Sequence, residues 1–178
     1  MEKCCLYIVL VRTNTIISRI IHFVKNDEYT HAAISFDKNL DNMYSFGRKY
    51  TYYPFIGRFR QEEIYKGLYK TQKRLPGVIM EVEVSEQQYR KAVSLLNRFI
   101  SNRNSYKYNY RGLLYSLLNK PLCYDDRFLC SEYVYYILNK SGIADFKRPR
   151  NLVRPQDLLK LKSRLVFKGD LKQFKPAI

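Results

Sequence analysis

The sequence predicts an α+β fold in which a small antiparallel sheet packs against helices. Three observations support this prediction. The chain has 178 residues, the length of one ordinary domain, and 46% of them are hydrophobic, which is enough to build a core. Short runs rich in β-branched residues alternate with segments whose apolar residues recur at helical spacing. No repeat or low-complexity tract interrupts the chain, so we expect a single domain over residues 1–178.

Three strands and one helix are predicted in the first 48 residues. Cys4–Val11 is a continuous apolar run typical of a buried strand. Residues 29–36 and 43–46 are predicted to be two further strands, which the polar turn at 37–42 joins into a hairpin. The segment 14–24 is predicted to be a helix, because its isoleucines recur at helical spacing.

The segment 49–77 is predicted to be a long aromatic and basic loop within the domain. It shows neither strand nor helix periodicity, and it contains Pro54, Gly57 and Gly67. Loops of this length are uncommon in a compact domain and often carry function. We therefore expect this loop to carry function.

Strands and helices also alternate in the second half. Ser85 and Gln88 form the Ser-x-x-Gln pattern of a capping box, which predicts a helix from there to about Ile100. The other elements predicted in this half are a strand at 78–84, helices at 106–118, 128–139 and 155–158, and a final strand at 165–168.

Positive charge is the strongest feature of the composition. The chain carries 32 Lys and Arg against 16 Asp and Glu, a formal net charge of +16. Such a field attracts phosphates, anionic lipid headgroups and anionic polymers, without choosing among them. Because a solvated basic face is the simpler explanation, we predict no specific nucleic-acid partner.

The chain is expected to be cytoplasmic. It has no run of about 18 uncharged apolar residues that would span a bilayer, and its N-terminal apolar run lacks the small-residue site of a cleavable signal. The four cysteines, Cys4, Cys5, Cys123 and Cys130, include no Cys-x-x-Cys pair, so they suit neither a zinc ribbon nor a disulfide scaffold. A reducing compartment is therefore expected.

His31 is a candidate catalytic residue. It opens the alternating segment 31–36, in which His31, Ala33 and Ser35 share one face of the strand. Because its two neighbours on that face are small, the imidazole has room for another element or a substrate to approach. The other histidine, His22, lies in the isoleucine-rich helix and is expected to be structural.

Cys130 is the candidate nucleophile. It stands near the start of the helix predicted at 128–139, on the inward face of that helix. The unpaired N–H groups and positive dipole end of a helix N-terminus favour a thiolate, and they also stabilise the oxyanion of a tetrahedral intermediate. A neighbouring imidazole, such as that of His31, stabilises the thiolate further as an ion pair. The alternative is an inert buried cysteine that begins a core helix.

Four segments carry a family resemblance: residues 29–35 (YTHAAIS), 44–48 (YSFGR), 108–110 (YNY) and 128–134 (FLCSEYV). A histidine that opens a strand, well before a cysteine that opens a helix, resembles the permuted NlpC/P60-like branch of the papain-like superfamily. The chain is most similar to the YiiX/YebB-like bacterial proteins, which are related to lecithin–retinol acyltransferase. The likeness covers most of the chain and is loosest over 49–77.

This resemblance implies a circularly permuted NlpC/P60 fold and a cysteine hydrolase or acyltransferase that forms an acyl-enzyme. Cys130 would be the nucleophile and His31 the base. The family places a third polar residue on the strand after the histidine, where it orients the imidazole, and we assign this role to Ser45. Since serine departs from the usual His, Glu, Asn or Gln, Glu62 and Glu63, folding back from the loop, stay open as alternatives.

Three residues near these segments are expected to bind substrate: Arg48 through an anionic group, and Tyr44 and Asn109 as part of the site lining. The alternatives are a solvent-facing Arg48 and an Asn109 that caps a helix or forms a turn. We expect no cofactor or metal, because the chain has no Gly-rich phosphate loop, dinucleotide motif or HExxH motif. A zinc site built from Cys123, Cys130 and a histidine is the weaker interpretation.

The expected substrate contains an amide or an ester. The positive field favours an anionic substrate, or peripheral contact with an anionic membrane or polymer, through steering alone. The family resemblance admits a peptide or isopeptide amide, a cell-wall fragment and a lipid ester. The competing hypothesis is a non-enzymatic binding protein on the same scaffold, whose basic and aromatic surfaces contact nucleic acid or anionic lipid.

Overall fold

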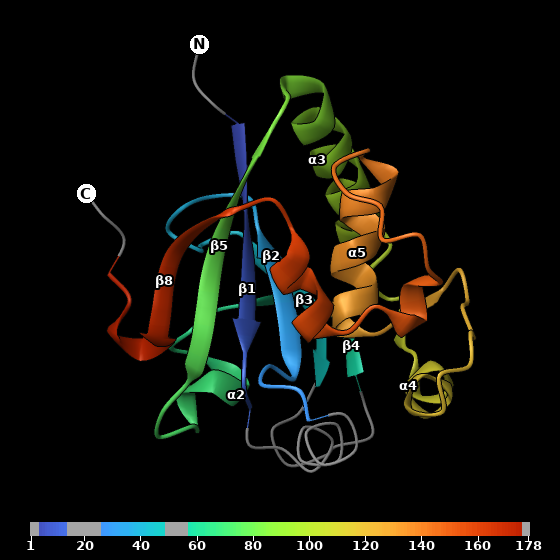
Figure 1. Cartoon of the computed structure of the whole chain (residues 1–178), viewed down its shortest axis with the longest axis horizontal. Helices are drawn as coiled ribbons and strands as arrows, with labels where there is room; N and C mark the ends of the chain where they lie inside the picture. The colour runs from blue at the N-terminus through green and yellow to red at the C-terminus, as the bar shows by residue number, and fades with distance from the viewer. Residues whose placement is uncertain (1–3, 14–25, 49–56, 176–178) are drawn as a thin grey trace.

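A six-stranded antiparallel sheet with strand order β4-β3-β2-β1-β5-β8 forms the centre of the molecule and confirms the α+β class (Figure 1). The computed structural model describes residues 4–13, 26–48 and 57–175. The helix predicted at 14–24, with His22, lies outside these residues. The strands of the sheet are β1 (Cys4–Val11), β2 (His31–Ser35), β3 (Met43–Arg48), β4 (Gly57–Glu62), β5 (Pro76–Val84) and β8 (Arg164–Asp170).

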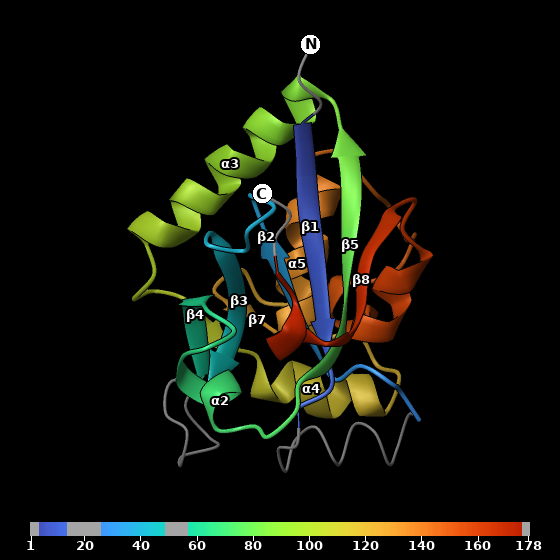
Figure 2. The same ribbon diagram turned by 90° about the vertical axis from the view of Figure 1, so that its left-hand side faces the viewer.

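Two long helices cover one face of the sheet, and shorter elements cover the other (Figures 1 and 2). α3 (Glu86–Ser101) and α5 (Cys130–Lys140) pack over the first face and enclose the larger apolar cluster. α2 (Gly67–Lys70) and the 3₁₀ turn η3 (Leu171–Gln173) lie against the second face, where a smaller apolar cluster is buried. Since β1 is buried on both faces, its sequence is continuously apolar instead of alternating.

Aromatic rings fill the space between the sheet and the long helices. The ring of Tyr133, on α5, has centroid distances of 5.6 Å to Phe46, 5.4 Å to Phe59 and 5.0 Å to Phe99. All four side chains are buried. Aromatic rings in such edge-to-face and tilted contacts stabilise a core beyond the area they bury. These four rings are therefore core residues, and their presence gives no argument for stacking on nucleic-acid bases.

The prediction of one long loop over 49–77 is wrong from residue 57 onward. Residues 57–62 form β4, which pairs with β3 at the edge of the sheet, and α2 and the start of β5 follow. Only Phe59 of β4 is a large apolar side chain, because a single face of this edge strand meets the core. One apolar residue in a strand is too weak a pattern to predict it. Residues 49–56 lie outside the described part of the chain.

Two predicted helices begin later than expected, because the residues before them form a second, small sheet. β6 (Lys107–Tyr108) pairs in parallel with β7 (Arg127–Phe128). As a result, α4 (Tyr110–Leu117) starts after Asn109, and α5 starts at Cys130. This shift places Cys130 at the first position of its helix.

Two 3₁₀ helices, η1 (Arg150–Leu152) and η2 (Pro155–Lys160), connect α5 to β8. The second of them confirms the short helix predicted at 155–158. Proline at the start of η2 has no N–H to leave unpaired, which suits the first turn of a helix.

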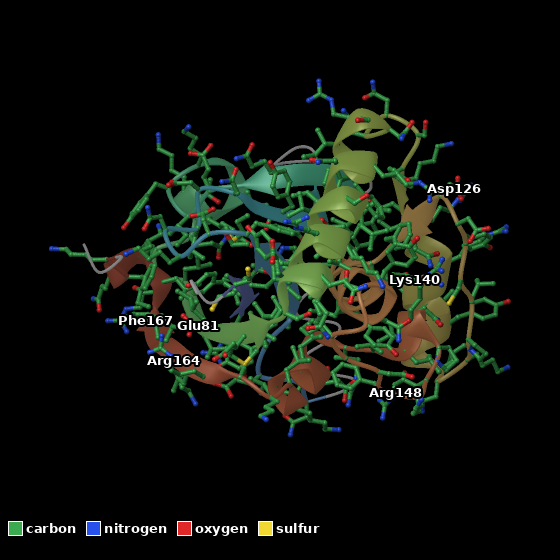
Figure 3. All side chains as sticks on the ribbon, turned by 90° about the horizontal axis from the view of Figure 1, so that it is seen from above. Glu81, Asp126, Lys140, Arg148, Arg164 and Phe167 are labelled. Carbon is green, nitrogen blue, oxygen red and sulfur yellow. The ribbon has the colours of Figure 1, made fainter. Side chains whose placement is uncertain are left out.

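Charged side chains surround the molecule when it is viewed from above (Figure 3). On the outer strands of the sheet, Arg164 donates two hydrogen bonds to the carboxylate of Glu81, each 3.0 Å long. Among the described residues, no helix is both long and apolar enough to cross a membrane.

The predicted capping box of α3 is confirmed. The Ser85 hydroxyl accepts from Gln88 N at 3.2 Å, and the Gln88 side chain accepts from Ser85 N at 2.9 Å. We expect Ser85→Ala to lower the free energy of unfolding by about 1 kcal/mol, because an N–H at the helix start loses its acceptor. Ser94→Ala, at an exposed site in the same helix, is the control and should change it by less than about 0.5 kcal/mol. Urea denaturation measures both variants, and equal effects would contradict the expectation.

Candidate active site

The side chains of His31, Glu62 and Cys130 meet, although their segments are far apart in the sequence. His31 begins β2, Glu62 ends β4 and Cys130 begins α5. The imidazole Nε2 lies 3.0 Å from Glu62 Oε2, and the Cys130 side chain is near enough to the imidazole to raise its pKa. The structure thus brings the predicted nucleophile and base together with a carboxylate.

Tyr69 of α2 supports this carboxylate. Its hydroxyl donates to Glu62 Oε2 at 2.8 Å, and its ring meets the His31 ring edge-on, with centroids 6.2 Å apart. Burial and the neighbouring Glu62 raise the pKa of Tyr69 well above its usual range, so the hydroxyl remains a donor. The sequence did not indicate Tyr69, since nothing in the predicted loop showed which way its tyrosines point.

Glycine at position 47 leaves room for the carboxylate. A Cβ atom added to Gly47 would lie 2.8 Å from Glu62 Oε1 and 3.8 Å from His31 Cε1. The first distance is shorter than a non-bonded contact allows, so any side chain there would displace the Glu62 carboxylate. The glycine of the segment YSFGR therefore leaves the space in which the Glu62 carboxylate reaches the imidazole.

The assignment of Ser45 as the residue that orients the imidazole is corrected to Glu62. The buried Ser45 hydroxyl donates to Ala32 O, in the adjacent strand, at 2.7 Å. Its short side chain reaches only the neighbouring backbone, whereas the longer side chain of Glu62 reaches the imidazole. The other alternative, Glu63, is exposed and pairs with Lys66 at 2.8 Å.

Negative groups hold the imidazole in its charged form. Burial alone would lower the pKa of His31, but the Glu62 carboxylate and then the Cys130 side chain raise it to about 10. Burial would also raise the pKa of Glu62, but the imidazolium beside it lowers that pKa. At neutral pH the pair is therefore an imidazolium and a carboxylate, adjacent to the sulfur of Cys130.

The start of α5 supplies backbone donors beside the sulfur. Leu129 occupies the N-cap position, where its side chain offers no acceptor to the first turn. The N–H groups of Cys130 and Ser131 thus stay at the positive end of the helix dipole without a side-chain cap. Such groups stabilise a thiolate and an oxyanion. The Ser131 hydroxyl anchors this turn by donating to Val153 O at 2.7 Å.

A buried carboxylate, Glu132, fixes the start of α5. Its Oε2 accepts from Leu129 N at 3.0 Å and from the Asn109 amide at 3.2 Å, and its Oε1 accepts from Arg150 Nε at 2.8 Å. Arg150 also donates to Tyr124 O. Burial raises the pKa of Glu132, against the lowering effect of these hydrogen bonds. Sequence reasoning missed this network, although an acidic residue inside an inward-facing apolar run was a signal for it.

Asn109 is a structural residue, so the prediction that it binds substrate is wrong. Its side-chain oxygen accepts from Gly112 N at 2.8 Å and caps α4, and its amide group donates to Glu132. The side chain is completely buried by these contacts. The alternative role as a helix cap is confirmed.

The other two predicted substrate-binding residues lie on β3. The ring of Tyr44 stacks on Phe59, with centroids 5.7 Å apart, on the face of the strand opposite Gly47. It therefore packs against the core and not beside the His31 ring. Arg48 is the last residue of β3, and its side chain lies outside the described part of the structure.

Cys123 is not brought to the imidazole. It is exposed, and its sulfur lies 3.4 Å from Asn151 Oδ1. Within the residues that the structure describes, no three His, Cys, Asp or Glu side chains are grouped to hold a metal ion.

We expect Glu62→Gln to lower the pKa of His31, because the carboxylate is the main group that raises it. Ser45→Ala, which removes a buried hydroxyl nearby, is the matched control and should leave the pKa unchanged. NMR titration of the imidazole carbon-bound protons measures both, and the chain has only two histidines to assign. If the pKa of His31 shifted in Ser45→Ala but not in Glu62→Gln, Ser45 and not Glu62 would be the residue that orients the imidazole.

The charged pair should also make stability depend on pH. Because folding raises the pKa of His31 from about 6.5 to about 10, its contribution is complete below pH 6.5 and is lost as the pH rises through 10. We therefore expect the free energy of unfolding of the wild type to fall relative to that of His31→Gln across this range. Urea denaturation at several pH values tests this, and parallel curves for the two proteins would contradict it.

No protein-family model matches the chain, and no curated protein matches its sequence. The resemblance to the permuted NlpC/P60-like branch therefore stays a prediction from the residues themselves.

Proposed function

We propose that this protein is a cysteine hydrolase or acyltransferase that acts on an amide or ester, on a permuted NlpC/P60-like scaffold. The observation that carries the proposal is the imidazole of His31, held between the Glu62 carboxylate and the Cys130 side chain. An inert core cysteine needs no charged partner, and burying an imidazolium costs free energy unless its partners are in place. Strongly perturbed pKa values of this kind cluster at catalytic sites.

In the proposed reaction, the Cys130 thiolate attacks the carbonyl carbon, so that an S–C bond forms and the carbonyl electron pair moves to oxygen. The N–H groups at the start of α5 stabilise this oxyanion. When the intermediate collapses, the C–N or C–O bond breaks and His31 gives its proton to the leaving amine or alcohol. Glu62 keeps its charge throughout and acts as a positioning residue.

The second half of the reaction restores the enzyme. The neutral His31 takes a proton from water, or from another acyl acceptor, as that molecule attacks the thioester carbonyl. Collapse breaks the S–C bond, releases the acid or the transferred product, and regenerates the thiolate and imidazolium. We place this activity in the cytoplasm, because a reducing compartment keeps a nucleophilic thiol reduced.

We expect Cys130 to react rapidly with iodoacetamide below pH 7, because the adjacent imidazolium favours the thiolate. His31→Ala should slow this labelling by about tenfold or more, because the imidazolium beside the sulfur is then absent. The measurement is the labelling rate from pH 5 to 9, read by peptide mass spectrometry. Exposed Cys123 is the internal control, whose labelling should not depend on His31.

Labelling of Cys130 that is slow below pH 8 and indifferent to His31 would overturn the proposal. The competing hypothesis of a basic binding protein predicts that outcome, since such a protein has no need of a reactive thiol. Fast, His31-dependent labelling would justify a screen of amides and esters.

A further inference from the structure

An open hollow of about 380 Å³ lies between the second half of α5 and the segment that follows this helix. Tyr136 and Lys140 of α5 line it. Arg148 and Arg150 line it from the following segment, and so does the exposed Cys123. A hollow of this volume admits a small molecule. None of the proposed catalytic residues lines it, so the hollow is separate from the candidate active site.

Several hydrogen-bond donors in this hollow have no acceptor within the described part of the chain. The Lys140 ammonium forms no ion pair there, and the Tyr136 hydroxyl forms no hydrogen bond there. Arg148 donates to Asp157 through Nη1 alone, at 3.3 Å, which leaves the donors of its Nε and Nη2 without an acceptor. Ammonium and guanidinium groups are donors only, so such a set is complementary to the oxygens of an anion.

The carboxylates near the hollow do not neutralise its cations. Asp157, the partner of Arg148, also lies within 3.6 Å of two other basic side chains, so its single charge is shared among three cations. Asp145 is the only carboxylate among the described residues that line the hollow, and it is paired with Lys147 at 2.7 Å. The hollow therefore keeps an excess of positive charge, which attracts an anion.

Arg150 gives the hollow a guanidinium that is already held in place. Its Nε donates to Glu132 at 2.8 Å, another of its nitrogens donates to Tyr124 O, and its guanidinium lies over the Phe128 ring, 4.9 Å from the centroid. The side chain is only 19% exposed. A donor whose position is fixed before binding loses little conformational freedom when a ligand arrives. This distinguishes the hollow from a solvated basic face, where long side chains move freely.

We infer that this hollow binds a small molecule that carries a phosphate or polyphosphate group. A guanidinium matches two phosphate oxygens at once, and an ammonium adds a point charge. A phosphate group has more acceptor oxygens than a carboxylate, so it can accept from Lys140 and from Arg148 together. These two side chains lie on the same side of the molecule (Figure 3). The inference does not depend on the proposed function.

Binding is tested by isothermal titration calorimetry with inorganic pyrophosphate at constant ionic strength. We expect the wild type to bind it, and Lys140→Gln/Arg148→Gln to bind it at least about tenfold more weakly. The matched control is Lys107→Gln/Arg111→Gln, which removes one lysine and one arginine from exposed positions outside the hollow and should bind as the wild type does. Arg150 is left in place because it holds Glu132. Circular dichroism melting verifies that all variants are folded.

The place of binding is tested through Cys123, whose thiol lines the hollow. A ligand in the hollow covers this thiol, so we expect pyrophosphate at about ten times its Kd to slow iodoacetamide labelling of Cys123 by about tenfold. The same protection is expected in Lys107→Gln/Arg111→Gln. At that pyrophosphate concentration, protection should be largely lost in Lys140→Gln/Arg148→Gln. Peptide mass spectrometry measures the labelling rate of each protein with and without pyrophosphate.

Three outcomes would overturn the inference. The first is no binding of pyrophosphate to the wild type, or an equal loss of binding in both double variants. The second is protection of Cys123 by sodium chloride at the same ionic strength, because the hollow would then be only a solvated basic face. The third is succinate binding as tightly as pyrophosphate, which would contradict the choice of phosphate. Neither readout uses Cys130, so an unreactive Cys130 would overturn the proposed function and leave this site intact.

Discussion

The position of Cys130 at the start of α5 depends on one buried carboxylate, that of Glu132. A charged group without exposed surface must find all its partners inside the fold, and here they are the Leu129 N–H, the Asn109 amide and the Arg150 guanidinium. These partners belong to the start of α5, the residue before α4, and η1. One side chain thus fixes three segments relative to one another. Removing any partner would leave a buried charge unsatisfied and release the turn that carries the sulfur.

Two buried glutamates act in opposite ways on the charge of the site. Glu62 stabilises the imidazolium, and with it the positive charge beside the sulfur. Glu132 follows Cys130, the proposed nucleophile, by two residues, where an uncompensated negative charge would oppose a thiolate. Arg150 compensates this charge from 2.8 Å. The helix dipole and the imidazolium can then both stabilise negative charge on the Cys130 sulfur. Arg150, by pairing with Glu132, is therefore part of the charge balance of the site.

Elements with strong local signals could be predicted from the sequence, and elements set by distant packing could not. β1 follows from its continuous apolar run, and the start of α3 from the Ser85 box. The pairing of His31 with Cys130 follows from residue types at element starts. The role of Glu62 could not be assigned from the sequence, because β4 has a single inward apolar residue and so gives no strand pattern. Tyr69 could not be assigned because α2 is only four residues long. Where local periodicity is absent, only the three-dimensional packing decides which way a side chain points.

The site joins β2, β4, α5 and, through Glu132, η1, so His31, Glu62, Cys130 and Arg150 come from separate segments of the chain. During synthesis Cys130 emerges from the ribosome before Arg150, and until η1 follows, the turn that holds the sulfur is incomplete. In the proposed enzyme, the reactive thiol would therefore form only with the completed fold, which separates synthesis from reactivity in time and spares the growing polypeptide from acyl transfer onto its own lysines.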